Sequence, residues 1–231
     1  MLRQDIYCLM IVYIHMHKPL VFFVGIDNTL LDSDRIKTEI KQSLIKVLGH
    51  GEANHFWKEH EEFRSKNNLV DFPKIIEKYC KEKHADTCAI KLKNIFFIID
   101  FKMAMYPAAS TALKHLKSLG NVAIFTEGDI AYQKRKVEQL ELNKLVDKIY
   151  LYLHKSDHID VIFTKWKGYT KVFIDDRSAK LINIKKQYPE TRIVEVCQGY
   201  YSNKDHVPHK KIDMVIESIE DLLKLSASDF Y

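Results

Sequence analysis

Short apolar runs alternate with longer amphipathic stretches along most of this chain, and this alternation limits its fold more than any other feature. The short runs are apolar over nearly their whole length, as is typical of parallel strands covered on both faces. The longer stretches, such as Ser110–Leu119, Ala131–Leu140 and Ala179–Gln187, have helical spacing. We therefore predict an α/β fold with a doubly wound, mostly parallel sheet. The predicted strands are Val21–Ile26, Val122–Thr126, Lys148–Leu153, Lys171–Asp175, Arg192–Val196 and Asp213–Ile216.

One interval, residues 34–104, breaks the alternation because it contains no convincing strand. Ile36, Ile40, Leu44 and Val47 repeat at helical spacing and stop before Gly49. Further helices are predicted over Ala53–Arg64, Pro73–Glu82 and within Ile90–Phe101. We interpret residues 34–104 as an all-helical cap inserted over the edge of a core formed by residues 16–33 and 105–231. Residues 1–15 are interpreted as an N-terminal extension.

Composition narrows the class of protein without identifying it. The 36 Lys and Arg exceed the 31 Asp and Glu by only five, and the lysines are scattered, so we expect no nucleic-acid partner. The apolar run Ile6–Met16 has about half of the roughly 20 residues that a membrane-spanning helix needs, so we expect no membrane partner. The cysteines are expected to be reduced thiols of a cytoplasmic protein; they are Cys8, Cys80, Cys88 and Cys197. Lys134, Arg135 and Lys136 are interpreted as a solvated helix face.

Polar residues follow three of the predicted strands at the points where the strands end. Asp27 and Thr29 follow the first, where turn capping is the competing interpretation. Thr126 ends the second and is followed by Glu127 and Gly128, a segment whose hydroxyl and N–H groups suit phosphate oxygens, or which caps the next helix.

The adjacent carboxylates Asp175 and Asp176 end a later strand. Two acids at one position repel each other unless a cation or a hydrogen-bond network lies between them, so a hard metal such as Mg²⁺ is a natural occupant. Capping remains an equal alternative for this pair. Lys155 follows the strand between these sites, although a single lysine is weak support by itself.

These four segments, in this order, resemble the haloacid dehalogenase-like (HAD) superfamily, most of whose members are Mg²⁺-dependent phosphatases. The resemblance extends from about Pro19 to Leu225 and includes a cap inserted after the first motif. It implies a Rossmann-like core, a HAD-type hydrolase activity and a small phosphorylated metabolite as the substrate. Residues that would bind this substrate are Thr29, Thr126, Glu127, Gly128 and Lys155.

The resemblance also implies a role for each matching side chain. Asp27 matches the general acid and base, whose backbone carbonyl is a metal ligand, and Thr126 matches the residue that holds the transferring phosphoryl group. Lys155 matches the lysine that neutralises the charge of nucleophile and phosphate. Asp175 and Asp176 match the acidic motif that anchors Mg²⁺.

The departure from the family lies at Gly25, where the family has the nucleophilic aspartate that also binds Mg²⁺. We therefore expect an impaired phosphohydrolase, with a hole above Gly25 in which a water molecule supports slow hydrolysis. The alternative is an inactive pseudoenzyme that binds phosphate ligands or has a regulatory role. A third interpretation is a point change, engineered or accidental, in an ordinary phosphatase. Dehalogenation ranks low because it also needs the missing aspartate and does not use the Asp175–Asp176 pair.

Overall fold

The structure is a computed structural model that describes residues 18–67, 71–82, 86–199 and 211–231. In this part of the chain six strands form one parallel sheet in the order β3-β2-β1-β4-β5-β6. The strands are β1 (Leu20–Val24), β2 (Asn121–Glu127), β3 (Lys148–Tyr152), β4 (Thr170–Asp175), β5 (Arg192–Val196) and β6 (Met214–Ile216). The predicted doubly wound α/β fold is confirmed, and each predicted strand is present with its ends shifted by at most two residues.

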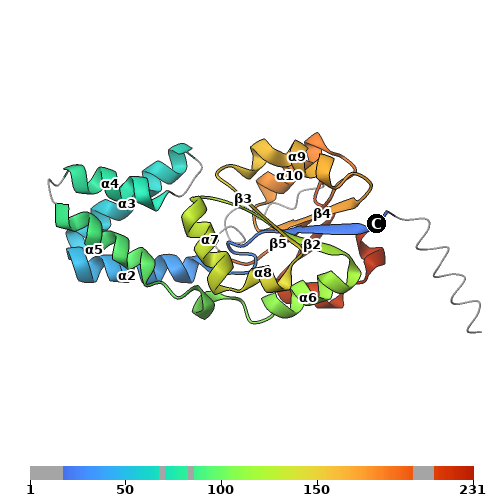
Figure 1. Ribbon diagram of the computed structural model, residues 1–231, viewed down its shortest axis with the longest axis horizontal. Coiled ribbons are helices and arrows are strands. Elements are labelled where there is room, and N and C mark those ends of the chain that lie inside the picture. Colours follow the sequence, from blue (N-terminus) through green and yellow to red (C-terminus); the bar gives the residue numbers. More distant parts are fainter. Residues whose placement is uncertain (1–17, 68–70, 83–85, 200–210) are drawn as a thin grey trace, which may run out of the picture.

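The middle of the sheet is buried on both faces, as its continuous apolar strands predict. Phe22 and Phe23 are neighbours in β1 and point to opposite faces. Phe22 belongs to a cluster with α6 (Ala109–Leu119) and packs edge-on against Phe230, with ring centroids 5.0 Å apart. Phe23 stacks on Phe173 at 4.7 Å in a second cluster, which includes residues of α9 (Ile159–Lys165) and α10 (Ser178–Gln187). The helices therefore cover both faces of the sheet (Figure 1).

Between β1 and β2 the described residues form helices and no further strand of the sheet, and the four helices before residue 98 lie at one end of the molecule, away from the strands (Figure 1). Asp32 caps the first helix by accepting from the Arg35 N–H, and Gly49, with a φ of 79°, follows its end. The helices before α6 are α2 (Ser33–Leu48), α3 (His50–Asn67), α4 (Phe72–Glu82), α5 (Asp86–Phe97) and the 3₁₀ turn η1 (Phe101–Ala104). The fold therefore includes a helical cap, whereas the domain boundaries at residues 34 and 104 stay a prediction.

The helix predicted within Ile90–Phe101 instead ends at Phe97, because the Asp100 side chain caps the separate turn η1. The remaining elements are α7 (Ile130–Gln139), α8 (Leu142–Leu145), and the 3₁₀ turns η2 (Lys155–His158), η3 (Ile219–Lys224) and η4 (Ala227–Phe230).

Within the described ranges, no helix combines the length and apolar character needed to cross a bilayer. The apolar run Ile6–Met16, the proposed extension 1–15, Cys8 and the side chain of Cys88 lie outside what the structure describes.

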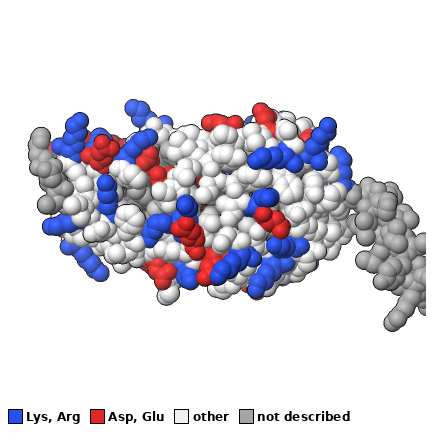
Figure 2. Space-filling view, viewed as in Figure 1, with Lys and Arg blue, Asp and Glu red and all other residues white. Residues whose placement is uncertain are grey.

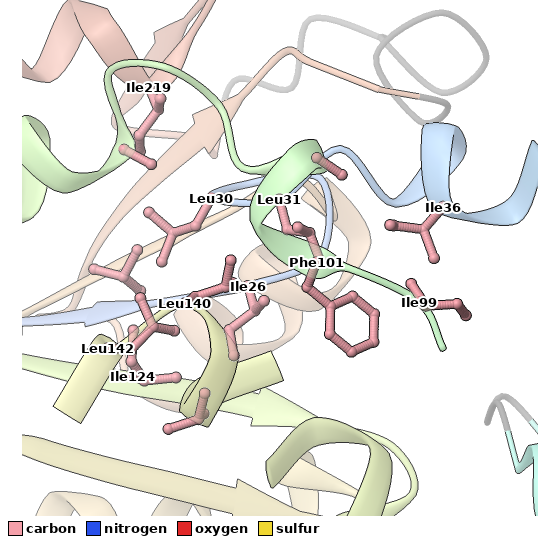
Figure 3. Close-up of a cluster of buried hydrophobic side chains, with 14 of the residues drawn as sticks. Ile26, Leu30, Leu31, Ile36, Ile99, Phe101, Ile124, Leu140, Leu142 and Ile219 are labelled. Atoms are coloured by element: carbon pink, nitrogen blue, oxygen red, sulfur yellow. The ribbon is translucent and has the colours of Figure 1, made fainter. Parts of the chain in front are cut away.

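The loop after β1 is anchored by a buried cluster that joins the sheet to the cap. Ile26, Leu30 and Leu31 of this loop belong to the same buried cluster as Phe101 and Ile36 (Figure 3), and all five side chains are almost completely buried. The cluster fixes the backbone on either side of Asp27, so the apolar residues of the loop position the polar one.

Candidate functional site

A cavity of about 160 Å³ lies between the carboxyl ends of the strands and the helical cap. This is where doubly wound sheets usually bind their ligands. The core contributes Gly25, Asp27, Thr126, Glu127, Gly128, Lys155, Asp175 and Asp176 to its wall, which are all but one of the residues singled out in the sequence. The cap contributes Ile36, Lys37, Ile40, His60, Arg64 and Phe72.

Thr29 is the exception, because its side chain is fully buried beneath the cavity and does not line it. Its expected contact with substrate is therefore wrong. The turn after Asp27 explains this placement: Asn28 has a left-handed φ of 52° and accepts the Ser33 N–H at 3.0 Å, so the chain folds back and carries Thr29 inward. The Thr29 hydroxyl has no hydrogen-bond partner among the described residues and would lie 3.2 Å from a Cβ at position 25.

The space above Gly25 is not the empty hole expected from the sequence. A Cβ atom at position 25 would lie 2.7 Å from Oδ2 of Asp175, so that carboxylate occupies the space of a side chain. The same oxygen lies 2.5 Å from Nζ of Lys155, and both side chains are about nine-tenths buried. Lys155 therefore pairs with the acidic motif in a chain that has no carboxylate at position 25.

Asp27 is held by three side chains, two of which come from α7. Its carboxylate lies 2.5 Å from Nζ of Lys136 and accepts hydrogen bonds from Gln133 at 3.0 Å and Ser33 at 2.5 Å. Burial alone would raise the pKa of Asp27, but Lys136 and these hydrogen bonds outweigh burial and lower the pKa to about 2. The carboxylate is therefore ionised at neutral pH and is a weak base.

The interpretation of Lys134 to Lys136 as a solvated face is wrong for Lys136, and Arg135 is only partly exposed. Lys136 is only 4% exposed, and Arg135 donates to the carbonyl oxygens of Phe96 and Phe97 at the end of α5. Gln133 and Lys136 are one helical turn apart, so both face Asp27. The sequence signal for this placement was the i, i+3 spacing of Gln133 and Lys136, directly after the Asp129 cap of α7.

Two groups of the Glu127–Gly128 segment, the Glu127 carboxylate and the Gly128 N–H, form contacts within the protein. The Glu127 carboxylate pairs with Lys180 and with Arg177, and it also accepts the N–H of Lys155 at 3.2 Å. The N–H of Gly128 donates to Tyr152 O at 3.0 Å, so the expectation of a free N–H at Gly128 is wrong. This ladder bond continues the pairing of β2 with β3 and removes that donor from the cavity.

The donor set of the acidic motif fits a hard divalent cation. Asp175 and Asp176 are both buried, and the pKa of Asp176 is raised well above its usual value, chiefly by burial and then by Asp175. A divalent cation relieves this repulsion and prefers such oxygens, so these carboxylates would hold Mg²⁺. Among the described residues, the only three acidic or histidine side chains with ligand atoms within 4.8 Å are His55, Glu59 and Glu82, away from the cavity. The Asp27 carboxylate, held by Lys136, therefore adds no third acid side chain to the pair.

The cap side of the cavity contains a buried histidine. His60 is 1% exposed, stacks on Phe72 at a centroid distance of 4.9 Å, and makes a tilted ring contact with Trp57 at 4.7 Å. Its pKa is lowered to about 4, chiefly by burial and also by Arg64 and Lys37, while Glu61 acts in the opposite direction. The ring is therefore neutral at pH 7.

This shift predicts an acid-sensitive cap. The unfolded chain protonates its histidine near pH 6.5 while the folded chain resists protonation until about pH 4, so the stability due to neutral His60 is complete above pH 6.5 and is lost as the pH falls toward 4. Urea unfolding should show that the free energy of unfolding falls between pH 7 and pH 4.5 in both proteins. The fall should be up to about 3 kcal/mol larger in the wild type than in His60→Phe. Equal losses in the two proteins would contradict the prediction.

No protein-family model matches the chain, and no curated protein sequence matches it either. A structure described as a haloacid dehalogenase-like hydrolase from Burkholderia xenovorans LB400 superposes with a TM-score of 0.84 at 26% identity, covering 91% of this chain and 100% of that one.

Two more distant structures share the fold. The HAD-hydrolase YfnB of Bacillus subtilis, bound to magnesium, has a TM-score of 0.61 at 12% identity and covers 90% of this chain and 100% of that chain. L-2-haloacid dehalogenase of Xanthobacter autotrophicus has a TM-score of 0.58 at 12% identity and covers 89% and 97%. The similar structures therefore include a magnesium-bound hydrolase and a dehalogenase, and their shared fold does not choose between these chemistries.

Proposed function

We propose that this chain, which belongs to the haloacid dehalogenase-like hydrolase superfamily, binds a small phosphomonoester in the cavity and hydrolyses it only slowly. One observation carries the proposal: Thr126, Lys155 and the Asp175–Asp176 pair line a single cavity at the carboxyl ends of β2, β3 and β4. A hydroxyl donor, an ammonium group and a divalent cation together match the oxygens of a phosphoryl group.

The acidic pair favours phosphate over halide chemistry. Two buried carboxylates, one with a raised pKa, are costly in a site that never receives a cation. A phosphoryl substrate with Mg²⁺ gives both carboxylates a role, because the metal ion would neutralise phosphate charge between them. Displacement of a halide from carbon gives the pair no such role. Carbon–halogen cleavage also needs a carboxylate nucleophile, and position 25 has none.

Gly25 accounts for the low rate that we propose. Without a carboxylate there, no aspartyl-phosphate forms, and attack depends on water. The candidate base, Asp27, has a pKa of about 2 and accepts a proton poorly. The second candidate function, a binding module without turnover, is favoured by the Lys155–Asp175 contact, because the Asp175 carboxylate occupies the space where a nucleophilic side chain at position 25 would lie.

Calorimetry with inorganic phosphate tests the proposed binding site. In the presence of Mg²⁺ we expect saturable binding that weakens about 10- to 160-fold in Thr126→Val, because the loss of one hydrogen bond to a charged group costs about 1.5–3 kcal/mol. Thr164→Val is the matched control, since Thr164 is exposed on α9 and its hydroxyl donates to a backbone carbonyl. Binding that is absent, or equal in Thr126→Val and the wild type, would refute the assignment of this cavity to phosphate.

A further inference from the structure

The end of the cavity opposite the acidic motif is lined by a basic group of the cap, which we call the cap cluster: Lys37, His60 and Arg64. Lys37 lies on α2, and the other two lie one helical turn apart on α3. Both cations act electrostatically on the His60 ring, so the three side chains form one group.

We call the end of the cavity that contains Thr126 and Lys155 the phosphoryl end. The start of helix α2 indicates how far Lys37 of the cap cluster lies from it. Ser33, the first residue of α2, donates to the Asp27 carboxylate, so this helix begins at the phosphoryl end. Lys37 follows one turn later, about 6 Å along the helix axis at 1.5 Å per residue. Ile36, Ile40 and Phe72 form apolar wall on the cap side of the cavity. One short ligand can therefore reach both ends.

The acidic partners of the two cations do not line the cavity. Lys37 pairs with Asp34 at 3.0 Å and Arg64 with Glu61 at 2.7 Å, both as i, i+3 pairs on their own helices. Lys37 and Arg64 line the cavity, whereas Asp34 and Glu61 do not. Partly exposed pairs of this kind contribute at most about 1 kcal/mol, so a ligand anion can compete for the cations.

His60 supplies an independent indication of a ligand. Its ring stacks on Phe72 and contacts Trp57, and neither ring nitrogen forms a hydrogen bond with the described residues, although Nδ1 lies 3.2 Å from the Glu61 carboxylate. An unsatisfied buried polar group costs about 1–3 kcal/mol. A neutral imidazole beside two cations can donate its N–H to a ligand oxygen without adding charge.

We propose that the ligand carries a second anionic group, a carboxylate or a second phosphate, which binds the cap cluster while its phosphoryl group binds near Thr126 and Lys155. This inference rests on the proposed function and narrows it to short phosphorylated acids. The apolar wall contacts the carbon chain between the two charged ends.

Two non-hydrolysable probes of similar length test the second anion. We expect calorimetry with Mg²⁺ to show that 3-phosphonopropionate binds the wild type about 10-fold more tightly than propylphosphonate, because only the first carries a carboxylate. Arg64→Gln should remove this preference and leave the affinity for propylphosphonate unchanged. Lys37→Met, which replaces a one-third-exposed side chain, should reduce the preference independently. Arg35→Gln is the matched control, because Arg35 also pairs with a glutamate on its own helix but does not line the cavity.

The outcomes separate this inference from the proposed function. If both probes bind equally to the wild type and inorganic phosphate displaces them, the phosphate site stands and the second anionic site is refuted. A preference that survives in both Arg64→Gln and Lys37→Met also refutes the cap cluster. If neither probe binds, the phosphate site itself fails and this inference fails with it.

Discussion

Replacing Gly25 with aspartate is expected to raise Mg²⁺-dependent hydrolysis of p-nitrophenyl phosphate by a factor on the order of 10⁴–10⁶. The new carboxylate supplies the nucleophile that divides phosphoryl transfer into two easier steps, and loss of a nucleophile in other hydrolases costs a factor of this order. It also adds a third carboxylate beside Asp175 and Asp176, so Mg²⁺ should bind more tightly. Initial rates over a series of Mg²⁺ concentrations measure both effects.

The surroundings of Gly25 can accept this side chain after one local change. The Asp175 carboxylate must rotate away, because its Oδ2 would lie 2.7 Å from the new Cβ, and this oxygen is the far end of a flexible side chain. Lys155, which now pairs with Asp175, would then lie near two carboxylates. The Thr29 hydroxyl, 3.2 Å from the new Cβ and without a partner among the described residues, gains an acceptor. That gain offsets part of the cost of another buried charge.

Two further variants separate nucleophilic attack from repositioning of Asp175. Gly25→Ala moves Asp175 without adding a nucleophile, and Gly25→Asn adds an isosteric amide that cannot form an acyl-phosphate. Both should remain within about 10-fold of the wild type if the aspartate acts by covalent catalysis. A Gly25→Asp protein that is folded, binds phosphate and still shows no turnover of a broad panel of phosphomonoesters would remove the support for a phosphatase ancestry of this site.

The sequence was sufficient to predict those site residues that directly follow a strand. Each strand of a parallel sheet ends at the same edge, so residues such as Asp27, Thr126 and Asp175 had to approach one another once the strands were recognised. The strands were recognisable because an apolar run such as Val122–Phe125 is buried on both faces. Their placement required no knowledge of side-chain contacts.

Other parts of the site depend on contacts between segments that are distant in sequence. Lys136 is buried because α7 packs beside the loop after β1, and its i, i+3 spacing from Gln133 indicates a shared helix face but not what that face contacts. Asp175 turns toward Gly25 because a glycine leaves room for it, an effect that depends on packing. The cap cluster requires α2 and α3 to face the sheet together. On the face of the molecule in Figure 2, basic and acidic side chains are interspersed, so net charge gives no guide to these sites either.

The second large effect is expected for Lys136→Met, which should lower the free energy of unfolding at pH 7 by about 2–3 kcal/mol. Removing one member of a buried ion pair costs about 3–5 kcal/mol because the other charge stays buried. The Lys136 side chain is 5% exposed, but that of Asp27 is 38% exposed toward the cavity, so water screens part of the loss. Lys134→Met is the control, because Lys134 lies on the same helix in an exposed pair with Glu138 and should change stability by less than about 0.5 kcal/mol.

The dependence on pH distinguishes a lost charge pair from lost packing. The pKa of Asp27 is about 2 in the folded protein and 3.8 ordinarily, so its contribution to stability is complete above about pH 4 and is lost as the pH falls toward 2. The difference between wild type and Lys136→Met in urea unfolding should therefore narrow between pH 4 and pH 2. If methionine only packs less well than lysine, the difference stays constant over that range. A constant difference would mean that Lys136 acts as a spacer, and Asp27 would then owe its low pKa to Ser33 and Gln133.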